Sequence, residues 1–219
     1  MSLVPEFPVY LFDVDGTLVD SAADICGAIL EVVKARPLSR SVDEFFLRRY
    51  IGHHLLATFG DLYPEAHNGE IDEMIAEYRR IYPLRDHANT KLYPGVAEAL
   101  AALPGRKSTA TTKSSATTRT VLEKFGIAQY FDHIQGTDGF PAKPAPDVIL
   151  RALEGLGASP SECLLVGDAG PDMEAGRRAG VKLCAVRYGY GDPAEMAKWE
   201  PDYWIDNLRD LQAASVHTS

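Results

Sequence analysis

The feature that most limits what this sequence can fold into is the alternation of short apolar runs with helical patterns after residue 93. Residues 163–166 are apolar, and so are residues 181–186 apart from Lys182; both runs are too short for helices and typical of buried strands. Helical patterns at 146–156 and 172–179 separate such runs. Alternating strands and helices predict a parallel sheet covered by helices, which is an α/β fold. The same part of the chain contains predicted helices at 96–103 and 117–125 and predicted strands at 107–111 and 133–135.

One more apolar run lies near the start of the sequence. Residues 9–12 stop at Asp13, and their length and composition predict a buried strand. A helical pattern covers 21–34, and Ser21 and Asp24 have the spacing of an N-terminal cap arrangement.

Residues 40–91 contain helical patterns and no convincing strand. The patterns lie at 41–50, 55–62 and 71–81, and glycines and prolines separate them. An all-helical block after the first strand predicts an inserted cap domain. We therefore expect an α/β core made of residues 1–19 and 92–219 and a helical cap made of residues 20–91.

Composition excludes several classes of protein. With 219 residues, 46% of them hydrophobic, the chain can fill a core. Its net charge of −9 argues against binding to nucleic-acid phosphates and against a polybasic membrane patch. The sequence has no basic leader pattern and no apolar run of about 18 residues, so we expect a cytoplasmic protein without a membrane span. Three scattered cysteines, Cys26, Cys163 and Cys184, favour reduced thiols over a disulfide framework or a zinc site.

Two carboxylates leave the end of the first predicted strand together. In open parallel sheets, ligands bind outside the carboxyl ends of the strands. One carboxylate of the pair Asp13 and Asp15 can attack phosphorus and form an aspartyl-phosphate. The other can give a proton to the leaving oxygen and later take one from water. Taken alone, this Asp-Val-Asp-Gly-Thr segment could also be a solvated turn.

Polar side chains follow three other predicted strands or loops. Thr111 and Thr112 can hold phosphoryl oxygens through hydroxyl and backbone N–H groups, although Thr-rich segments are usually ordinary loops. Lys143 lies between prolines and would supply a positive charge, unless it is a solvated loop lysine. Asp168 and Asp172 suit Mg²⁺, which prefers a few carboxylates together with water and a substrate phosphate. Asp172 could also be only the cap of the following helix.

In order and spacing, these segments closely resemble the four motifs of the haloacid dehalogenase-like hydrolase superfamily. The resemblance covers nearly the whole chain and is strongest to the phosphoglycolate phosphatase-like group with a helical cap. It implies a Rossmann-like parallel core with an inserted α-helical cap. Thr112 departs from the pattern, because that group often has Asn there. The matching segments are Asp13-Val14-Asp15-Gly16-Thr17, Thr111, Lys143, and Gly167-Asp168 with Asp172.

The resemblance implies a role for each matched residue. Asp13 would be the nucleophile and a Mg²⁺ ligand, and Asp15 the acid/base whose carbonyl oxygen also binds the metal. A dehalogenase needs no such acid, so the presence of Asp15 favours a phosphatase. Asp168, with Asp172 close behind, would complete the metal site. The phosphoryl group would be held by Thr111 and Lys143, whereas Thr112 is a phosphate-binding candidate because of its place at the strand end.

Substrate choice is expected to lie in the cap. The resemblance places the segment around Gly52 where such caps contact substrate, so Arg49 and His53 are candidates to bind a substrate carboxylate. Exposed arginines of this kind are more often solvated or paired. We expect a small phosphorylated metabolite as the partner, with 2-phosphoglycolate as the first choice, and a monomer or homodimer.

Other functions fit the same motifs. A sugar phosphomutase, a pyrophosphatase and a phosphonate hydrolase of this superfamily all remain open. A phosphonate hydrolase would need a Schiff-base lysine in the cap, and Lys34 is the only cap lysine before Lys91. A non-catalytic regulatory module is a further alternative, against which the intact motif residues argue.

Overall fold

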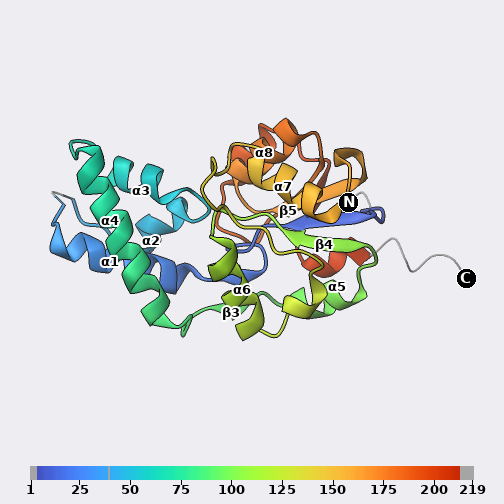
Figure 1. The fold of residues 1–219 in the computed structure, drawn as a ribbon, viewed down its shortest axis with the longest axis horizontal. Helices are drawn as coiled ribbons and strands as arrows, with labels where there is room; N and C mark the ends of the chain where they lie inside the picture. The colour runs from blue at the N-terminus through green and yellow to red at the C-terminus, as the bar shows by residue number, and fades with distance from the viewer. Residues whose placement is uncertain (1–3, 39, 213–219) are drawn as a thin grey trace, which may run out of the picture. The chain divides into compact units, whose positions relative to one another are not determined.

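The computed structural model describes residues 4–38 and 40–212. The chain forms two compact units, which are described separately (Figure 1). A core unit contains the described residues up to Asp20 and those from Leu92 onward, and a cap unit contains Ser21–Lys91. The cap unit is therefore a single insertion into the core sequence.

The core unit is built on a five-stranded sheet. Every neighbouring pair of strands is parallel, which confirms the predicted α/β fold class. The register pairs Phe12 with Thr109 on one side and with Val166 on the other. The strand order is β4 (Arg106–Thr109), β1 (Val9–Phe12), β5 (Cys163–Gly167), β6 (Lys182–Val186) and β7 (Tyr203–Ile205).

Helices cover both faces of this sheet (Figure 1). Side chains alternate along a strand, so Tyr10 and Phe12 of β1 pack in one hydrophobic cluster and Val9 and Leu11 in another. Burial on both faces explains why the run is apolar throughout. One face carries α5 (Val96–Ala102) and α6 (Ser115–Lys124), and the other carries α7 (Asp147–Leu156) and α8 (Gly170–Ala179). The remaining core elements are α9 (Pro193–Ala197) and the 3₁₀ turns Ala128–Tyr130, Pro160–Glu162 and Leu208–Gln212.

The described part of the cap unit is helical. Apolar side chains of its longest helices, among them Ile29 and Met74, are buried. Two short strands, β2 (Val19–Asp20) and β3 (Lys91–Leu92), pair where the chain leaves and re-enters the core sequence. The cap helices are α1 (Ala22–Ala35), α2 (Glu44–Leu47), α3 (Leu55–Leu62) and α4 (Asn68–Ile81), with 3₁₀ turns at Arg48–Tyr50 and Tyr82–Arg85.

Three local predictions were wrong. The Ser21 side chain makes no cap hydrogen bond, and the carboxylate of Asp24 instead accepts hydrogen bonds from Asn89 and Thr90. Residues 133–135 form only an isolated bridge between His133 and Ser108, because no continuous ladder follows it. The segment 41–50 is interrupted: helix starts only after Asp43, which caps it, and tightens into a 3₁₀ turn.

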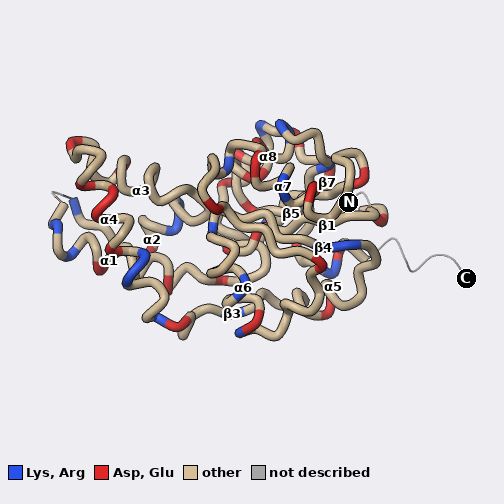
Figure 2. Tube along the Cα trace, in the orientation of Figure 1, with Lys and Arg blue, Asp and Glu red and all other residues tan. Residues whose placement is uncertain are grey.

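Charged residues of both signs are dispersed along both units, with Lys and Arg interspersed among Asp and Glu (Figure 2). None of the helices in the described part of the chain is long and apolar enough to cross a membrane.

Candidate active site

The turn after β1 folds back onto the end of β5. The backbone N–H of Asp13 donates to the carbonyl oxygen of Val166 over 2.9 Å. Gly16 has φ +95, and a Cβ there would overlap the Asp168 carboxylate, so this position requires glycine for both reasons. The Thr17 hydroxyl donates to Asp168 Oδ1 over 3.1 Å. The two strand ends predicted to carry chemistry therefore meet.

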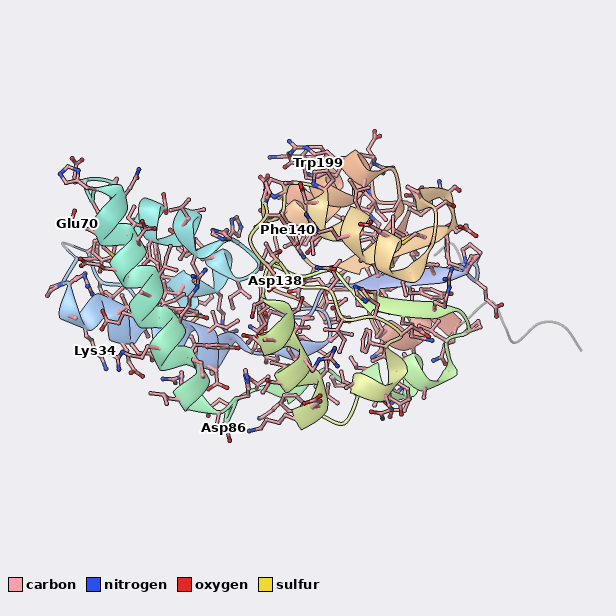
Figure 3. The ribbon with its side chains drawn as sticks, in the orientation of Figure 1. Lys34, Glu70, Asp86, Asp138, Phe140 and Trp199 are labelled. Atoms are coloured by element: carbon pink, nitrogen blue, oxygen red, sulfur yellow. The ribbon has the colours of Figure 1, made fainter. Side chains whose placement is uncertain are left out.

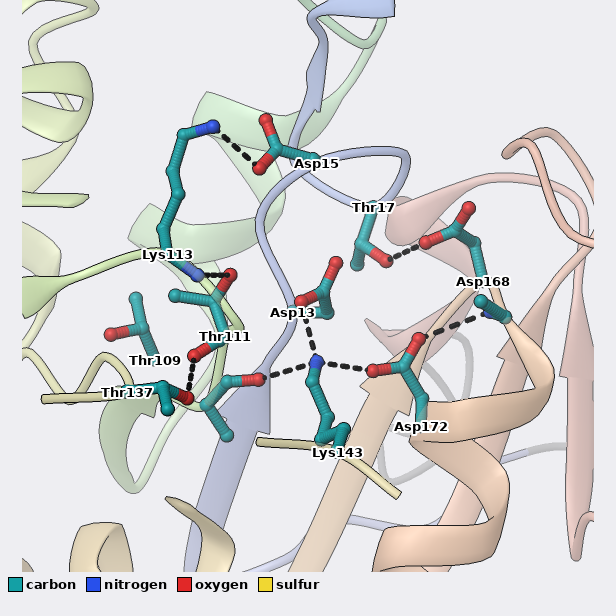
Figure 4. Close-up of polar contacts among 12 residues, drawn as sticks. Asp13, Asp15, Thr17, Thr109, Thr111, Lys113, Thr137, Lys143, Asp168 and Asp172 are labelled. Atoms are coloured by element: carbon teal, nitrogen blue, oxygen red, sulfur yellow. Dashed lines mark hydrogen bonds and ion pairs between the residues drawn. The ribbon is translucent and has the colours of Figure 1, made fainter. Parts of the chain in front are cut away.

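Lys143 joins these strand ends from a third segment. Its ammonium donates to Asp13 Oδ1 over 2.6 Å, to the carbonyl oxygen of Ala110 over 2.9 Å, and to Asp172 Oδ1 (Figure 4). The lysine is only 3% exposed. All three of its protons have acceptors, so the cation is held in one orientation.

Three buried carboxylates lie together around this lysine. Asp13, Asp168 and Asp172 each offer one oxygen, and these oxygens lie within 4.8 Å of one another. Asp13 Oδ2 is buried and has no hydrogen-bond partner among the described residues. Buried acceptors are normally satisfied, so this orphan oxygen is the observation that fits a bound cation.

Asp172 serves two elements at once. Its Oδ2 accepts from the backbone N–H of Ala169 over 3.0 Å at the start of α8, while its Oδ1 accepts from Lys143. Helix capping and membership of the charged cluster are therefore compatible, although the sequence presented them as alternatives.

The electrostatics of the cluster reflect burial and crowding. Burial raises the pKa of Asp13, and Asp172 adds to this effect while Lys143 opposes it. Burial and the charges of Asp13 and Asp172 raise the pKa of Asp168 as well. Burial by itself would lower the pKa of Lys143, but the adjacent carboxylates raise it. When all three carboxylates are ionised, they leave two negative charges against the one ammonium, which a divalent cation would balance.

Asp15 pairs with a lysine that sequence reasoning left without a role. Lys113 Nζ lies 2.8 Å from Asp15 Oδ2, and both side chains are largely buried. Lys113 directly follows Thr111 and Thr112. Its position beside this polar strand end was the one sequence feature that pointed to a role in the site. Because the contact joins two loops, strand patterns alone could not reveal it.

Thr111 and Thr112 lie just beyond β4. The carbonyl oxygen of Thr111, which is buried, accepts from the Thr137 hydroxyl over 2.9 Å, and Thr112 is half-buried beside it. Asp138, labelled in Figure 3, accepts from the backbone N–H and hydroxyl of Ser115 at the start of α6. The loop that leads to Lys143 is thereby tied to the loop after β4.

The two cap candidates belong to the other unit. Arg49 Nε donates to the carbonyl oxygen of Phe46 over 3.0 Å, and its guanidinium lies 4.2 Å from the centre of the Phe46 ring. His53 is exposed in the turn before α3, and its backbone N–H donates to the carbonyl oxygen of Tyr50. Their contact with a substrate stays a prediction.

Comparison with known proteins agrees with this geometry. The model of the haloacid dehalogenase-like hydrolases matches residues 10–186. A phosphoglycolate phosphatase of Aquifex aeolicus is 32% identical and covers 93% of this chain and 94% of its own length. A pyrophosphatase of Oceanobacillus iheyensis is also 32% identical, with coverages of 92% and 93%. The solved structure of a haloacid dehalogenase-like hydrolase from Streptococcus pneumoniae has a TM-score of 0.86 at 27% identity, covering 95% of this chain and 98% of its own.

Proposed function

Because the chain belongs to the haloacid dehalogenase-like hydrolase family and its relatives support a phosphoric monoester hydrolase, we propose that it is a Mg²⁺-dependent phosphatase acting through an aspartyl-phosphate. The observation that carries this proposal is the buried cluster in which Lys143 bridges Asp13 and Asp172 next to Asp168. Phosphoryl transfer depends mostly on positioning and on charge neutralisation, and this cluster is suited to both.

Two carboxylates would divide the chemistry. A carboxylate oxygen of Asp13 attacks phosphorus while the bond from phosphorus to the leaving oxygen breaks. Asp15 gives its proton to that leaving oxygen, then takes a proton from the water that hydrolyses the aspartyl-phosphate and releases inorganic phosphate. Lys113 contacts Asp15 and would hold it toward the leaving group.

The remaining polar residues would bind and neutralise. Thr111 and Thr112 are proposed to hold the phosphoryl oxygens, and Lys143 to hold the phosphoryl group through its positive charge. Asp13, Asp168 and Asp172, with the carbonyl oxygen of Asp15, would hold Mg²⁺, which supplies positive charge to the transferring group when bound. The orphan Asp13 Oδ2 and the excess of two negative charges support a divalent ion there.

The proposed substrate is a small phosphate monoester, with 2-phosphoglycolate first because several relatives are named phosphoglycolate phosphatases. Pyrophosphate is the second candidate, since the pyrophosphatase relative has the same sequence identity to this chain as the Aquifex aeolicus phosphoglycolate phosphatase. Arg49 and His53 are proposed to bind the substrate carboxylate. We propose also that the enzyme acts in the cytoplasm on a free metabolite.

The test is hydrolysis by the purified protein, with and without Mg²⁺, of an aryl phosphate, 2-phosphoglycolate, sugar phosphates and pyrophosphate. We expect Mg²⁺-dependent release of phosphate, with the highest kcat/KM for 2-phosphoglycolate. Asp13→Asn should lose activity by at least about a thousandfold, because a nucleophile is removed rather than weakened. Asp72→Asn, an exposed change on α4, is the matched control and should behave as wild type.

Appreciable turnover by a folded Asp13→Asn protein would exclude Asp13 as nucleophile. A higher kcat/KM for pyrophosphate would replace the first substrate candidate by the second and leave the mechanism intact.

A further inference from the structure

The loop that follows β6 lies directly on Asp168. The backbone N–H of Tyr190 donates to Asp168 Oδ2 over 2.8 Å. A Cβ at Gly189 would overlap the Asp168 side chain, and a Cβ at Gly191 would overlap the Asp168 carbonyl oxygen. Glycine at these positions lets the loop backbone approach this closely. The place of the loop therefore determines how one oxygen of Asp168 is held.

Both tyrosines of this loop reach the segment 17–20, which we call the linker. The Tyr188 hydroxyl donates to the carbonyl oxygen of Thr17 over 2.8 Å. The Tyr190 hydroxyl donates to Asp20 Oδ1 over 2.6 Å. Asp20 is the last residue of the core unit before the cap sequence begins. The centre of the Tyr188 ring also lies 4.7 Å from the centre of the Tyr93 ring. Tyr93 directly follows β3, where the chain re-enters the core sequence.

We propose that Tyr190 is a positioning residue that couples the linker residue Asp20 to Asp168. The proposal rests on the proposed function, in which Asp168 is a metal ligand. One residue makes both contacts, through its backbone N–H and its side-chain hydroxyl, so a displacement at either end is passed to the other. Coupling between two sites is reciprocal. If the Tyr190–Asp20 contact strengthens Mg²⁺ binding by a given factor, Mg²⁺ binding strengthens that contact by the same factor.

Tyr190→Phe tests the coupling because it removes the hydroxyl and keeps the N–H that holds Asp168. A hydrogen bond contributes about fivefold to an equilibrium constant, so we expect the Kd for Mg²⁺ to rise by about three- to fivefold. Isothermal titration calorimetry with Mg²⁺ alone, on the substrate-free protein, measures this. Asp20→Ala removes the acceptor from the other side and should weaken binding as well, while the double variant should be no weaker than Asp20→Ala.

Hydrogen exchange gives a second measurement that a merely structural role would not change. In the wild-type protein, Mg²⁺ should slow exchange of the linker amides. In Tyr190→Phe this slowing should be lost at Asp20, whereas Thr17 keeps its direct hydrogen bond to Asp168. Tyr203→Phe is the matched control. Tyr203 lies in β7 and packs on Phe7, so this change should leave Mg²⁺ binding unchanged.

Each outcome bears on the proposal. A wild-type Kd in Tyr190→Phe, additive losses in the double variant, or an equal loss in Tyr203→Phe overturns the coupling while leaving the phosphatase proposal in place. A wild-type protein that binds no Mg²⁺ overturns both. If Tyr190→Phe fails to fold, Asp20→Ala alone must show the loss of Mg²⁺ affinity, and wild-type affinity in that variant overturns the coupling.

Discussion

Lys143 is the single residue on which the charge balance of the buried cluster depends. It is nearly inaccessible to water and contacts Asp13 and Asp172 directly. Breaking a buried ion pair by removing one partner is far more costly than losing an exposed pair, because the other charge stays buried.

Lys143→Met should therefore destabilise the protein strongly. We expect the free energy of unfolding, measured by urea titration in the presence of a chelator, to fall by about 3–5 kcal/mol. Mg²⁺ should recover part of this loss, because it supplies positive charge to the same carboxylates.

Lys182→Met is the control for this change. Lys182 pairs with Asp202 on the surface, with its side chain 54% exposed, so its loss should cost far less than the loss of Lys143. Equal stability of Lys143→Met and Lys182→Met would show that the buried cluster does not need its lysine.

The convergence of the charged cluster could be expected from the sequence, whereas its pairing could not. Asp13 and Asp168 follow central strands, and the ends of parallel strands meet at one edge of a sheet. The ion pair of Lys113 with Asp15 and the contacts of Tyr190 depend on how loops fold, and no periodic pattern records this.

At the scale of elements, Asp24 ties the beginning of the cap sequence to its end. This buried carboxylate of α1 accepts from the backbone N–H of Asn89 over 2.9 Å and from the Thr90 hydroxyl over 2.8 Å. Arg85 Nε lies 3.6 Å from it. Burial by itself would raise the pKa of Asp24, but these hydrogen bonds and the arginine lower it below its ordinary value.

This pKa predicts a pH-dependent contribution to stability. Because the folded pKa is lowered, Asp24 stabilises the cap above its unfolded pKa of about 3.9, and this contribution is lost as pH falls through the folded value. Asp24→Asn should cost about 2 kcal/mol at neutral pH. The gap to wild type should shrink below about pH 4.

Urea unfolding at several pH values measures this gap, with the exposed Asp72→Asn as the control that should show a much smaller one. A gap that stays constant down to pH 3 would mean that the Asp24 carboxylate contributes nothing through its charge.

Elements buried on both faces could be predicted from their residues. β1 has the expected bounds, and β5 and β6 differ from expectation by one residue at one end. β7 was missed because it has only three residues, two of them half-buried. It is a strand because it pairs with β6, which its own sequence does not reveal. Asp24 was misassigned as part of a helix cap because its partners lie far along the chain.

For the whole molecule, we propose that the core unit sets the reaction and the cap unit sets the substrate. Arg49→Ala should then lower kcat/KM for 2-phosphoglycolate by about ten- to a hundredfold, the effect of one lost charged hydrogen bond. His53→Ala should act in the same direction. Neither change should alter kcat/KM for an aryl phosphate that lacks a carboxylate.

Arg48→Ala is the matched control, because this neighbouring arginine pairs with Glu44 on the surface. Steady-state kinetics on both substrates separate the possibilities. If 2-phosphoglycolate and the aryl phosphate lose equally in Arg49→Ala, the arginine does not read the carboxylate.

The insertion of the cap sequence between β1 and β4 also bears on how the protein is made. β1 is central in the sheet, and its partners begin at Arg106 and Cys163. On a ribosome, the continuous cap segment is complete before either partner emerges, so it can fold first. Meanwhile the apolar β1 strand has no neighbour to pair with, and such a strand is prone to aggregate or to be held by a chaperone. The strand that leads to Asp13, the proposed nucleophile, is therefore made early in synthesis and is among the last parts of the sheet to gain its neighbours.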